Sequence, residues 1–400
     1  MKTACATAAL LFAFAFTQPA IAQKQYGPGV TDTEIKLGQT MPYSGPASSY
    51  GTIGKVEAAY FRMINEHGGI NGRKIDLISL DDGYSPPKTV EQVRRLVEED
   101  HVLGTFQILG TPTNTAIVNY MNEHKVPQLF VATGATKWGD YKHTPWTMGW
   151  QPTYQTEGHI YAKYILNTLP NAKIAILYQN DDAGKDYVKG LKDGLGDKAA
   201  TMIVKEVSYE TSDATVDSQV VSLQQSGADL FYNVAIPKFA AQAIRKAYDI
   251  GWHPTQILAN VSASIAATLM PAGTEKSVGI ISTQYLKEPL DPTWANDKGI
   301  EDWHAFMKQY YPEGDLKDAA NVYGYTVAAT MVQVLKQCGD DLTRENLMKQ
   351  AANLKDLELP LLLPGIKINT SPTRYFPITQ EKLIRFDGKT WVQIGDVISG

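Results

Sequence analysis

Predicted strands and helices alternate along most of the chain, and this alternation limits its fold more than any other feature. Four apolar runs in the first part of the chain are typical of buried strands: Ile35–Thr40, Lys74–Asp81, Thr105–Gly110 and Pro127–Thr133. Helical segments of about 10–15 residues or slightly more separate them, the longest being the amphipathic segment from Tyr50 to His67. Strands joined in this way form βαβ units, so the sequence predicts a parallel, doubly wound α/β sheet.

The pattern breaks near Trp146–Pro152 and then begins again. Its second set of predicted strands is Lys173–Gln179, Thr201–Val207, Asp229–Ala235 and Gln256–Asn260. Predicted helices follow near Trp294–Tyr310, Ala319–Lys336 and Arg344–Ala352, and Lys382–Val397 is typical of a β-hairpin. A chain of 400 residues is too long for one ordinary domain. We therefore expect two α/β lobes with a tight hinge.

The composition is that of a soluble globular protein, with 44% apolar and 20% charged residues. It excludes a disordered tail, a collagen-like repeat and a multi-span membrane protein. The formal net charge of −5 disfavours a nucleic-acid partner, because phosphate binding depends on basic surfaces. Seven His and two Cys leave little material for a metal centre, so we expect no metal and no cofactor.

The first 22 residues are typical of a cleaved export signal. Lys2 precedes a short apolar core from Ala8 to Phe16, and Ala20-Ile21-Ala22 matches a cleavage site. The apolar core is too short to span a bilayer. We expect a mature protein that begins near Gln23, is exported from the cytoplasm and does not insert into the membrane.

One cysteine, Cys338, remains after removal of the signal. It cannot form an intramolecular disulfide, and it lies in a strong helical pattern. A buried, unreactive thiol is favoured over a reactive one.

Two strand-to-helix turns carry hydroxyl groups. In open α/β sheets, ligands bind beyond the carboxyl ends of the strands. The turns Gly110–Asn114 and Thr133–Thr136 stand at such ends, and a hydroxyl beside a helix N-terminus forms a seat for an anion. Helix capping is the structural alternative for each turn alone.

Aromatic residues gather near the predicted cleft. Tyr43, Tyr50, Trp150 and Tyr154 together suit an apolar or aromatic ligand, although any one of them is explained by packing. The acids Asp181-Asp182 end a predicted strand, and capping of the following helix is their favoured role.

The sequence contains no motif of a known catalytic class. There is no G-x-S-x-G, no H-E-x-x-H and no C-x-x-C. We therefore expect a binding protein and not an enzyme.

Several of these segments together resemble the branched-chain amino-acid-type periplasmic binding proteins of bacterial ABC transporters. The resemblance rests on Ser44-Gly45-Pro46 followed by Tyr50-Gly51, on Asn65-Glu66-His67-Gly68-Gly69-Ile70-Asn71-Gly72, and on Asp81-Asp82. It extends over essentially the whole mature chain.

The resemblance implies a type I fold, in which two Rossmann-like lobes are joined by a three-crossover hinge and close on a small ligand. The crossovers would fall near Trp150, Ile281–Gln284 and Tyr375. Lobe 1 would comprise 23–150 and 282–375, and lobe 2 would comprise 151–281 and 376–400. The implied partners are a small carboxylate ligand and the membrane permease of an ABC transporter, and the implied location is the periplasm. The oligomeric state stays open, with a monomer as the default.

The resemblance also implies particular ligand-binding residues. In the family, hydroxyls and backbone groups of two lobe 1 turns hold the ligand carboxylate. The matching positions here are Thr111, Gly134 and Thr136, and the aromatic ring that packs on the ligand matches Tyr50.

Two positions depart from the amino-acid-binding pattern. A tyrosine that closes over the amino acid is replaced by Ala183, and the acid that pairs with the ligand ammonium is replaced by Asn260. A neutral amide cannot neutralise a buried ammonium, whose unpaired charge costs several kcal/mol. The expected ligand is therefore a carboxylic acid without an amino group, specifically an aromatic acid of the benzoate or cinnamate kind.

Three alternatives stay open. A hydrophobic amino acid would bind if Asp181 or Asp182 paired with its ammonium group. A ligand-sensing module would have the same fold, and an exported hydrolase would reveal itself by turnover of aryl esters.

Overall fold

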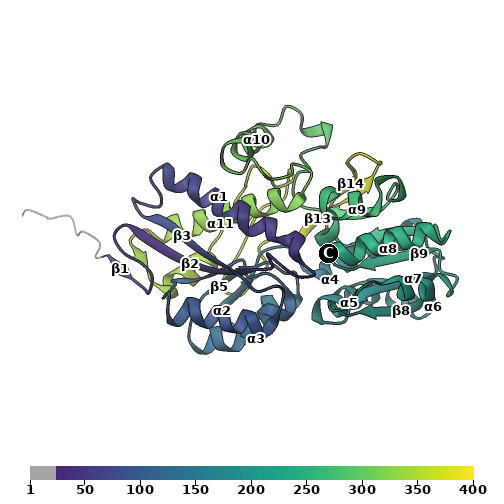
Figure 1. Ribbon diagram of the computed structural model, residues 1–400, viewed down its shortest axis with the longest axis horizontal. Coiled ribbons are helices and arrows are strands. Elements are labelled where there is room, and N and C mark those ends of the chain that lie inside the picture. The colour runs from purple at the N-terminus through teal and green to yellow at the C-terminus, as the bar shows by residue number, and fades with distance from the viewer. Residues whose placement is uncertain (1–23) are drawn as a thin grey trace, which may run out of the picture.

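The computed structural model describes residues 24–400, and the predicted export signal at 1–22 lies outside them. The described chain forms two lobes that lie side by side, each built around its own sheet (Figure 1). A short parallel pair, β1 (Gln25–Tyr26) with β12 (Asp341–Leu342), ties the start of the described chain to a segment more than 300 residues later.

The first sheet has five parallel strands in the order β3-β2-β4-β5-β6. They are β2 (Glu34–Met41), β3 (Lys74–Asp81), β4 (Gly104–Phe106), β5 (Gln128–Val131) and β6 (Thr147–Gly149). Most residues of β2, β4, β5 and β6 are buried, as is usual for parallel strands covered on both faces. The chain runs outward in both directions from β2 and β4, so the strand order reverses between these two strands.

Helices from both early and late parts of the chain cover this sheet. They are α1 (Gly51–Glu66), α2 (Pro86–Glu98), α3 (Thr111–Glu123), α10 (Lys298–Tyr310), α11 (Ala319–Cys338) and α12 (Arg344–Ala351). Helix α1 packs against α11, and α2 packs against α3. Val56 of α1 and Trp303 of α10 are fully buried in the same core, which explains why the late helical segment needs no sheet of its own.

The second sheet has seven strands in the order β14-β13-β11-β10-β9-β7-β8. They are β7 (Ile174–Gln179), β8 (Ile203–Tyr209), β9 (Leu230–Val234), β10 (Thr255–Leu258), β11 (Ile281–Gln284), β13 (Gln380–Phe386) and β14 (Trp391–Ser399). Strands β7 to β11 are parallel and repeat the order of the first sheet, with the reversal between β7 and β9. The C-terminal hairpin β13-β14 adds to β11 in antiparallel pairing.

The faces of the second sheet are covered by α4 (Tyr154–Thr168) with α5 (Asp182–Leu195), and by α7 (Asp217–Gln224) with α8 (Pro237–Asp249). Shorter elements complete this lobe: α6 (Ala199–Met202), α9 (Met270–Ala272), the 3-10 turns η3 (Gly196–Lys198), η4 (Asn260–Ser262) and η6 (Thr274–Lys276), and a π-helical turn, η5 (Ile265–Leu269). Lobe 1 holds three more 3-10 turns, η1 (Ser48–Tyr50), η2 (Thr136–Gly139) and η7 (Pro292–Trp294).

Most predicted strands differ from the structure by one or two residues at an end, and two of them differ more than the others. The strand expected at Thr105–Gly110 ends at Phe106, because Gln107 has a φ of 57° and turns the backbone out of the extended conformation. The strand expected at Thr201–Val207 begins at Ile203, since Ala199–Met202 forms the short helix α6. Both differences concern the ends of elements, which local sequence patterns define least well.

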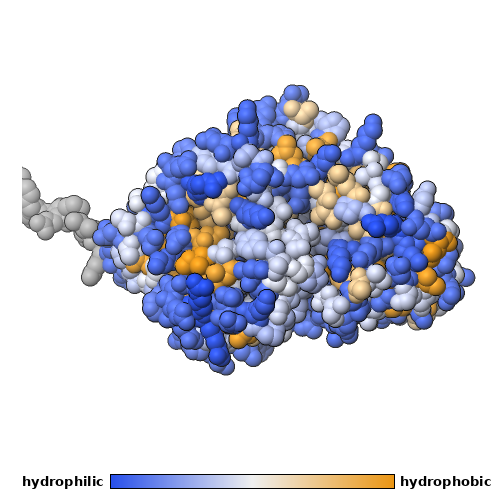
Figure 2. All heavy atoms as spheres, viewed as in Figure 1, coloured by the Kyte–Doolittle hydropathy of each residue, from blue (hydrophilic) through white to orange (hydrophobic). Residues whose placement is uncertain are grey.

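The face seen in Figure 1 is mostly hydrophilic, with an apolar area over β2 and β3 (Figure 2). Strand β3 is the edge of the first sheet, and its residues Leu77, Ile78 and Leu80 are only half-buried. Among residues 24–400, no helix combines the length and the apolar character needed to cross a bilayer.

Cys338 should not react with a thiol reagent in the folded mature protein. Its side chain is 5% exposed, and burial raises the pKa of the thiol to about 12, so almost no thiolate forms near neutral pH. Labelling with a chromogenic disulfide reagent at about pH 8 should be complete in urea and negligible without it. Rapid labelling of the native protein would contradict this assignment.

Candidate ligand-binding site

A cavity lies between the two lobes, at the carboxyl ends of the parallel strands of both sheets. The turns at both reversals of strand order contribute to its wall: Tyr50 and Thr111 from lobe 1, Ala183 and Ile236 from lobe 2. Its volume is about 150 Å³. Switch points are where α/β sheets bind ligands, so topology alone selects this cavity as the site.

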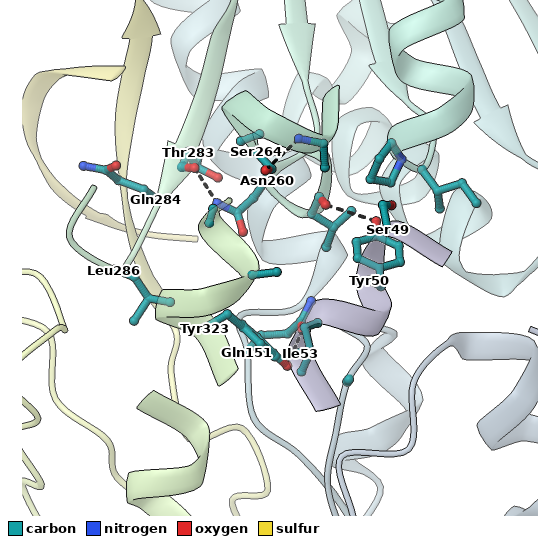
Figure 3. A pocket seen from close by; sticks show the side chains of 18 of the residues that line it. Ser49, Tyr50, Ile53, Gln151, Asn260, Ser264, Thr283, Gln284, Leu286 and Tyr323 are labelled. Carbon is teal, nitrogen blue, oxygen red and sulfur yellow. Dashed lines mark hydrogen bonds between the residues drawn. The ribbon is translucent and has the colours of Figure 1, made fainter. Parts of the chain in front are cut away.

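The wall is rich in aromatic rings and neutral polar groups. The rings are those of Tyr50, Tyr84, Tyr154, Tyr187, Tyr285, Tyr323 and Trp391. The neutral polar side chains are Ser49, Thr111, Gln151, Gln179, Asn260, Ser264, Thr283 and Gln284. In Figure 3, Tyr50 and Leu286 lie on opposite sides of the cavity, with Asn260 between them.

Thr111 begins helix α3 and is part of the wall. Its hydroxyl lies 2.5 Å from the hydroxyl of Thr133, so the two turns predicted to form the anion seat are in contact at these residues. No side chain caps the N-terminus of α3, which leaves the first N–H groups of this helix without a side-chain partner. Gly110 has a φ of 103°, and a Cβ there would meet the Tyr84 ring at 2.5 Å. Glycine therefore allows the helix to begin at the cavity wall.

Gly134 and Thr136, two other predicted ligand-binding residues, are not among the residues that line the cavity. The ring of Tyr154 covers Gly134, since a Cβ on this glycine would meet the ring at 2.8 Å. The backbone N–H of Thr136 donates to Asp186 of α5 at 2.6 Å, whereas its buried hydroxyl has no hydrogen-bond partner. Their role in binding stays a prediction.

Only two of the four aromatic residues predicted near the cleft line the cavity. Tyr50 and Tyr154 line the cavity, whereas Tyr43 and Trp150 do not. The hydroxyl of Tyr43 lies 2.6 Å from that of Ser79, and the indole of Trp150 donates to Thr330. Tyr154 stacks on Tyr187, with ring centroids 4.4 Å apart.

Ala183 and Asn260, the two departures from the amino-acid pattern, both line the cavity from lobe 2. Ala183 is in the first turn of α5, where its small side chain leaves space. The amide of Asn260 donates to the carbonyl oxygen of Thr283 at 2.5 Å (Figure 3). Asn260 begins the turn η4 and does not belong to the preceding strand, which ends at Leu258.

Glu157, which sequence reasoning missed, holds the Asn260 turn in place. This glutamate of α4 is 3% exposed and accepts hydrogen bonds from the backbone N–H of Asn260 at 2.7 Å, from Tyr161 at 2.8 Å and from Tyr187 at 2.9 Å. Burial raises the pKa of Glu157 and of its neighbour Glu381. Three donors stabilise a charge on Glu157, and Glu381 accepts only one bond, from Thr283, so the proton of this pair belongs on Glu381.

A signal for Glu157 does exist in the sequence. It is an acid on the apolar face of α4, four residues before Tyr161, and a carboxylate in such a place needs donors nearby. The identity of those donors depends on tertiary contacts with α5 and η4.

The two acids proposed as substitutes for the missing ammonium partner have other roles. Asp181 caps α5, accepting from the N–H of Gly184 at 3.0 Å and from the side chain of Gln179 at 2.6 Å. Asp182 pairs with Lys137 of lobe 1 at 2.8 Å, and this lysine holds the pKa of its carboxyl below the usual range. Neither acid lines the cavity.

Three charged side chains do line the cavity: Lys287, Glu288 and Asp318. Lys287 pairs with Asp297 at 2.6 Å. Asp318 caps α11 and accepts from Ser264 of lobe 2 at 2.9 Å. Glu288 is 7% exposed and has a single hydrogen bond, from the N–H of Leu290 at 3.1 Å. Of the charged groups on this wall, Glu288 is therefore the least satisfied.

Hydrogen bonds cross between the lobes on both sides of the cavity. Near α3 and α5 they are the Thr136–Asp186 and Lys137–Asp182 contacts. On the side of α1 and α11, Ser264 bonds to Asp318, and the N–H of Ala266 donates to the carbonyl of Lys317. Tyr50 reaches the carbonyl oxygen of Val261 at 3.0 Å. The lobes therefore stand in a closed arrangement around the cavity.

A family model described as "periplasmic binding protein" matches residues 34–377 of the chain. The chain belongs to this family. The fold expected from the resemblance, two Rossmann-like lobes of the type I class, is confirmed.

Individual relatives agree with this assignment. A Leu/Ile/Val-binding protein homolog from Brucella abortus is 24% identical, with 78% of this chain and 81% of the homolog aligned. A branched-chain amino-acid ABC transporter protein from Thermus thermophilus, solved with bound valine, superposes with a TM-score of 0.82 at 14% identity, covering 93% of this chain and 98% of that one. An ABC transporter solute-binding protein from R. palustris in complex with 4-hydroxybenzoate gives 0.75 at 17% identity, covering 92% and 97%.

Glu288→Gln should flatten the pH dependence of the free energy of unfolding. Burial raises the pKa of Glu288 from 4.5 to about 7, so the folded chain binds this proton more tightly than the unfolded chain. The corresponding stability is fully present below pH 4.5 and is lost as the pH rises to about 7. A shift of this size corresponds to about 3 kcal/mol.

Urea unfolding at about pH 5 and pH 8 measures this contribution as the difference between wild type and variant. The matched control is Glu275→Gln, which removes an exposed carboxyl group and should preserve the wild-type slope. An unchanged slope for Glu288→Gln would contradict the burial of an ionisable group at this position.

Proposed function

We propose that this protein is the periplasmic solute receptor of an ABC importer, and that it closes by hinge motion on an aromatic carboxylic acid without an amino group. Membership in the periplasmic binding protein family supports the role of a receptor. The predicted export signal supports the location. The proposed activity is binding and release without chemical conversion of the ligand.

The ligand class rests on one observation: the acids around Asn260 are already bonded to other groups of the protein. An amino-acid ligand needs a carboxylate close to its ammonium group, and the cavity presents an amide at the matching position. Asp181 and Asp182 are both bonded to other groups, and the carboxylate of Glu157 already accepts hydrogen bonds from three donors. A ligand without an ammonium group avoids the cost of burying an unpaired charge.

Hydroxyl and N–H donors suit the carboxylate of such a ligand. Thr111 and the uncapped N-terminus of α3 offer donors and a partial positive charge at the cavity wall. The one lysine in the wall, Lys287, is already paired with Asp297. Hydrogen bonds to a carboxylate contribute about 1.5–3 kcal/mol each, so a seat without a cation is sufficient for binding.

The size and lining of the cavity suit a single aromatic ring. A cavity of about 150 Å³ in an otherwise packed protein core accommodates benzene, and the volume here is about 150 Å³. Tyrosine rings on both lobes, such as Tyr50 and Tyr187, offer faces and edges for a ligand ring. Because these rings belong to different lobes, a ligand contacts all of them only in the closed form and shifts the population toward closure.

A hydrophobic amino acid is the second candidate ligand. Glu288 favours it, because this carboxyl group lines the cavity with a single hydrogen bond and has capacity for another donor. The amino-acid-binding relatives have the same fold, so the fold does not decide between the two ligands.

Aromatic acids should stabilise the mature protein, and leucine should not. Thermal-shift measurements with benzoate, 4-hydroxycinnamate, phenylalanine and leucine, side by side, test this directly. Thr111→Ala should weaken binding of the acid about tenfold or more, through loss of a hydrogen bond to the carboxylate. The control is Thr168→Ala, which removes a threonine hydroxyl from the exposed face of α4. Stabilisation by leucine alone would refute the proposed ligand.

Asn260→Asp should weaken binding of an aromatic acid by about tenfold or more near neutral pH. The new carboxylate would face both the ligand and the carbonyl oxygen of Thr283, and like charges in a buried cavity repel. Isothermal titration calorimetry measures the change in Kd. Asn167→Asp makes the same charge change at an exposed site on α4 and should leave affinity unchanged. Unchanged or tighter acid binding by Asn260→Asp would mean that Asn260 does not lie against the bound acid.

A further inference from the structure

One part of the cavity has polar chemistry that a plain aromatic acid would not use. The crossover that leaves β11 forms part of the wall, through Leu286, Glu288 and Pro289, and the C-terminal hairpin also contributes to the wall, through Ile384 and Trp391. The turn of the crossover contacts this hairpin, since Gln393 donates to Asp291 at 3.3 Å. Glu288 is the carboxyl group that this crossover contributes to the wall.

Glu288 is short of donors for a buried carboxyl group. Its side chain is more than nine-tenths buried, and its one hydrogen bond comes from the backbone two residues along the chain. The neighbouring lysine, Lys287, forms its ion pair with Asp297 and not with Glu288, and Asp291 is a second acid nearby. Buried carboxylates usually accept several hydrogen bonds, so Glu288 has an acceptor oxygen available to a ligand.

We propose that Glu288 binds a hydroxyl group of the ligand, so that the receptor selects hydroxylated aromatic acids over unsubstituted ones. This inference rests on the proposed function and names the second polar group of its ligand. A carboxyl group at 288 repels the ligand carboxylate, which therefore binds elsewhere, at the Thr111 wall. A hydroxyl donates to Glu288 in either protonation state of the glutamate, because both states retain an acceptor oxygen.

The geometry favours a hydroxyl on a ring over the ammonium of an α-amino acid. Thr111 bonds to Thr133 within lobe 1, whereas the Glu288 turn contacts strand β14 of the other sheet. An α-amino acid carries both of its charged groups on one carbon atom, but a hydroxylated aromatic acid holds its two polar groups apart on a rigid ring. Thr111 and Glu288, which belong to different segments of the wall, match the second arrangement.

The test measures the affinity of ligands that differ in a hydrogen-bond donor, the hydroxyl group on the ring. Each ligand is measured with variants that differ in the hydrogen-bond acceptor at position 288. The ligands are benzoate and its 3- and 4-hydroxy and 3- and 4-methoxy derivatives, since methylation removes the donor and keeps the oxygen. The variants of the mature protein are Glu288→Ala and the isosteric Glu288→Gln. The control, Asp291→Asn, removes a neighbouring acid that does not line the cavity. Circular dichroism and urea unfolding establish that each variant is folded.

In the wild type, one hydroxybenzoate should bind at least about tenfold more tightly than its methoxy partner. In Glu288→Ala this preference should fall to about twofold, with the Kd of benzoate nearly unchanged. Glu288→Gln, which keeps one acceptor oxygen, should lie between them, and Asp291→Asn should behave as wild type.

Three results would overturn the inference, and they are distinguishable. If the acids bind but the preference for a hydroxylated ligand is equal in wild type and Glu288→Ala, the proposed function is retained and the proposed role of Glu288 is refuted. If Glu288→Ala loses binding of leucine and keeps that of the acids, the partner of Glu288 is an ammonium group. If no aromatic acid binds the wild type, the proposed ligand class fails and the inference fails with it.

Discussion

Parallel pairing of strands is the constraint on which the rest of this structure depends. In each sheet, every strand-to-helix turn leaves from the same edge, because parallel strands all end there. The reversals of strand order, between β2 and β4 in one sheet and between β7 and β9 in the other, open a gap between neighbouring turns. When these edges face each other, the turns of Thr111 and Ala183 become opposite walls of one cavity.

Buried acids then give the cavity its chemical character. Glu157 is satisfied by three donors and serves as a support for the Asn260 turn and for Tyr187. Asp181 caps the N-terminus of its own helix, α5. Glu288 differs from both, because it faces the cavity with one hydrogen bond. The same residue type thus has a structural role where donors converge on it, and it is available for the proposed recognition role where they do not.

Closure depends on contacts on both sides of the cavity. Lys137 and Asp182 form an ion pair whose side chains are partly exposed, and such a pair contributes little by itself. The bond between Ser264 and Asp318 is buried and links the start of the π-helical turn η5 to the start of α11. One buried apolar cluster also contains residues of both lobes, among them Ile53, Tyr84 and Ile236. A hinge motion must separate this cluster as well as break the polar contacts, and a ligand between the lobes adds to both.

The sequence by itself determined the repeated α/β pattern, the two lobes and the turns that would meet at the cleft, because strand and helix periodicity is local and parallel topology follows from it. It also placed Tyr50, Thr111, Ala183 and Asn260 at positions that line the cavity. Only the tertiary structure decided that Gly134 and Thr136 lie behind the wall, since the Tyr154 ring and the Asp186 carboxylate reach them from segments outside their own turn. It alone revealed Glu157 and Glu288 as well. The role of a buried acid depends on which donors surround it, and those donors come from residues far away in the chain.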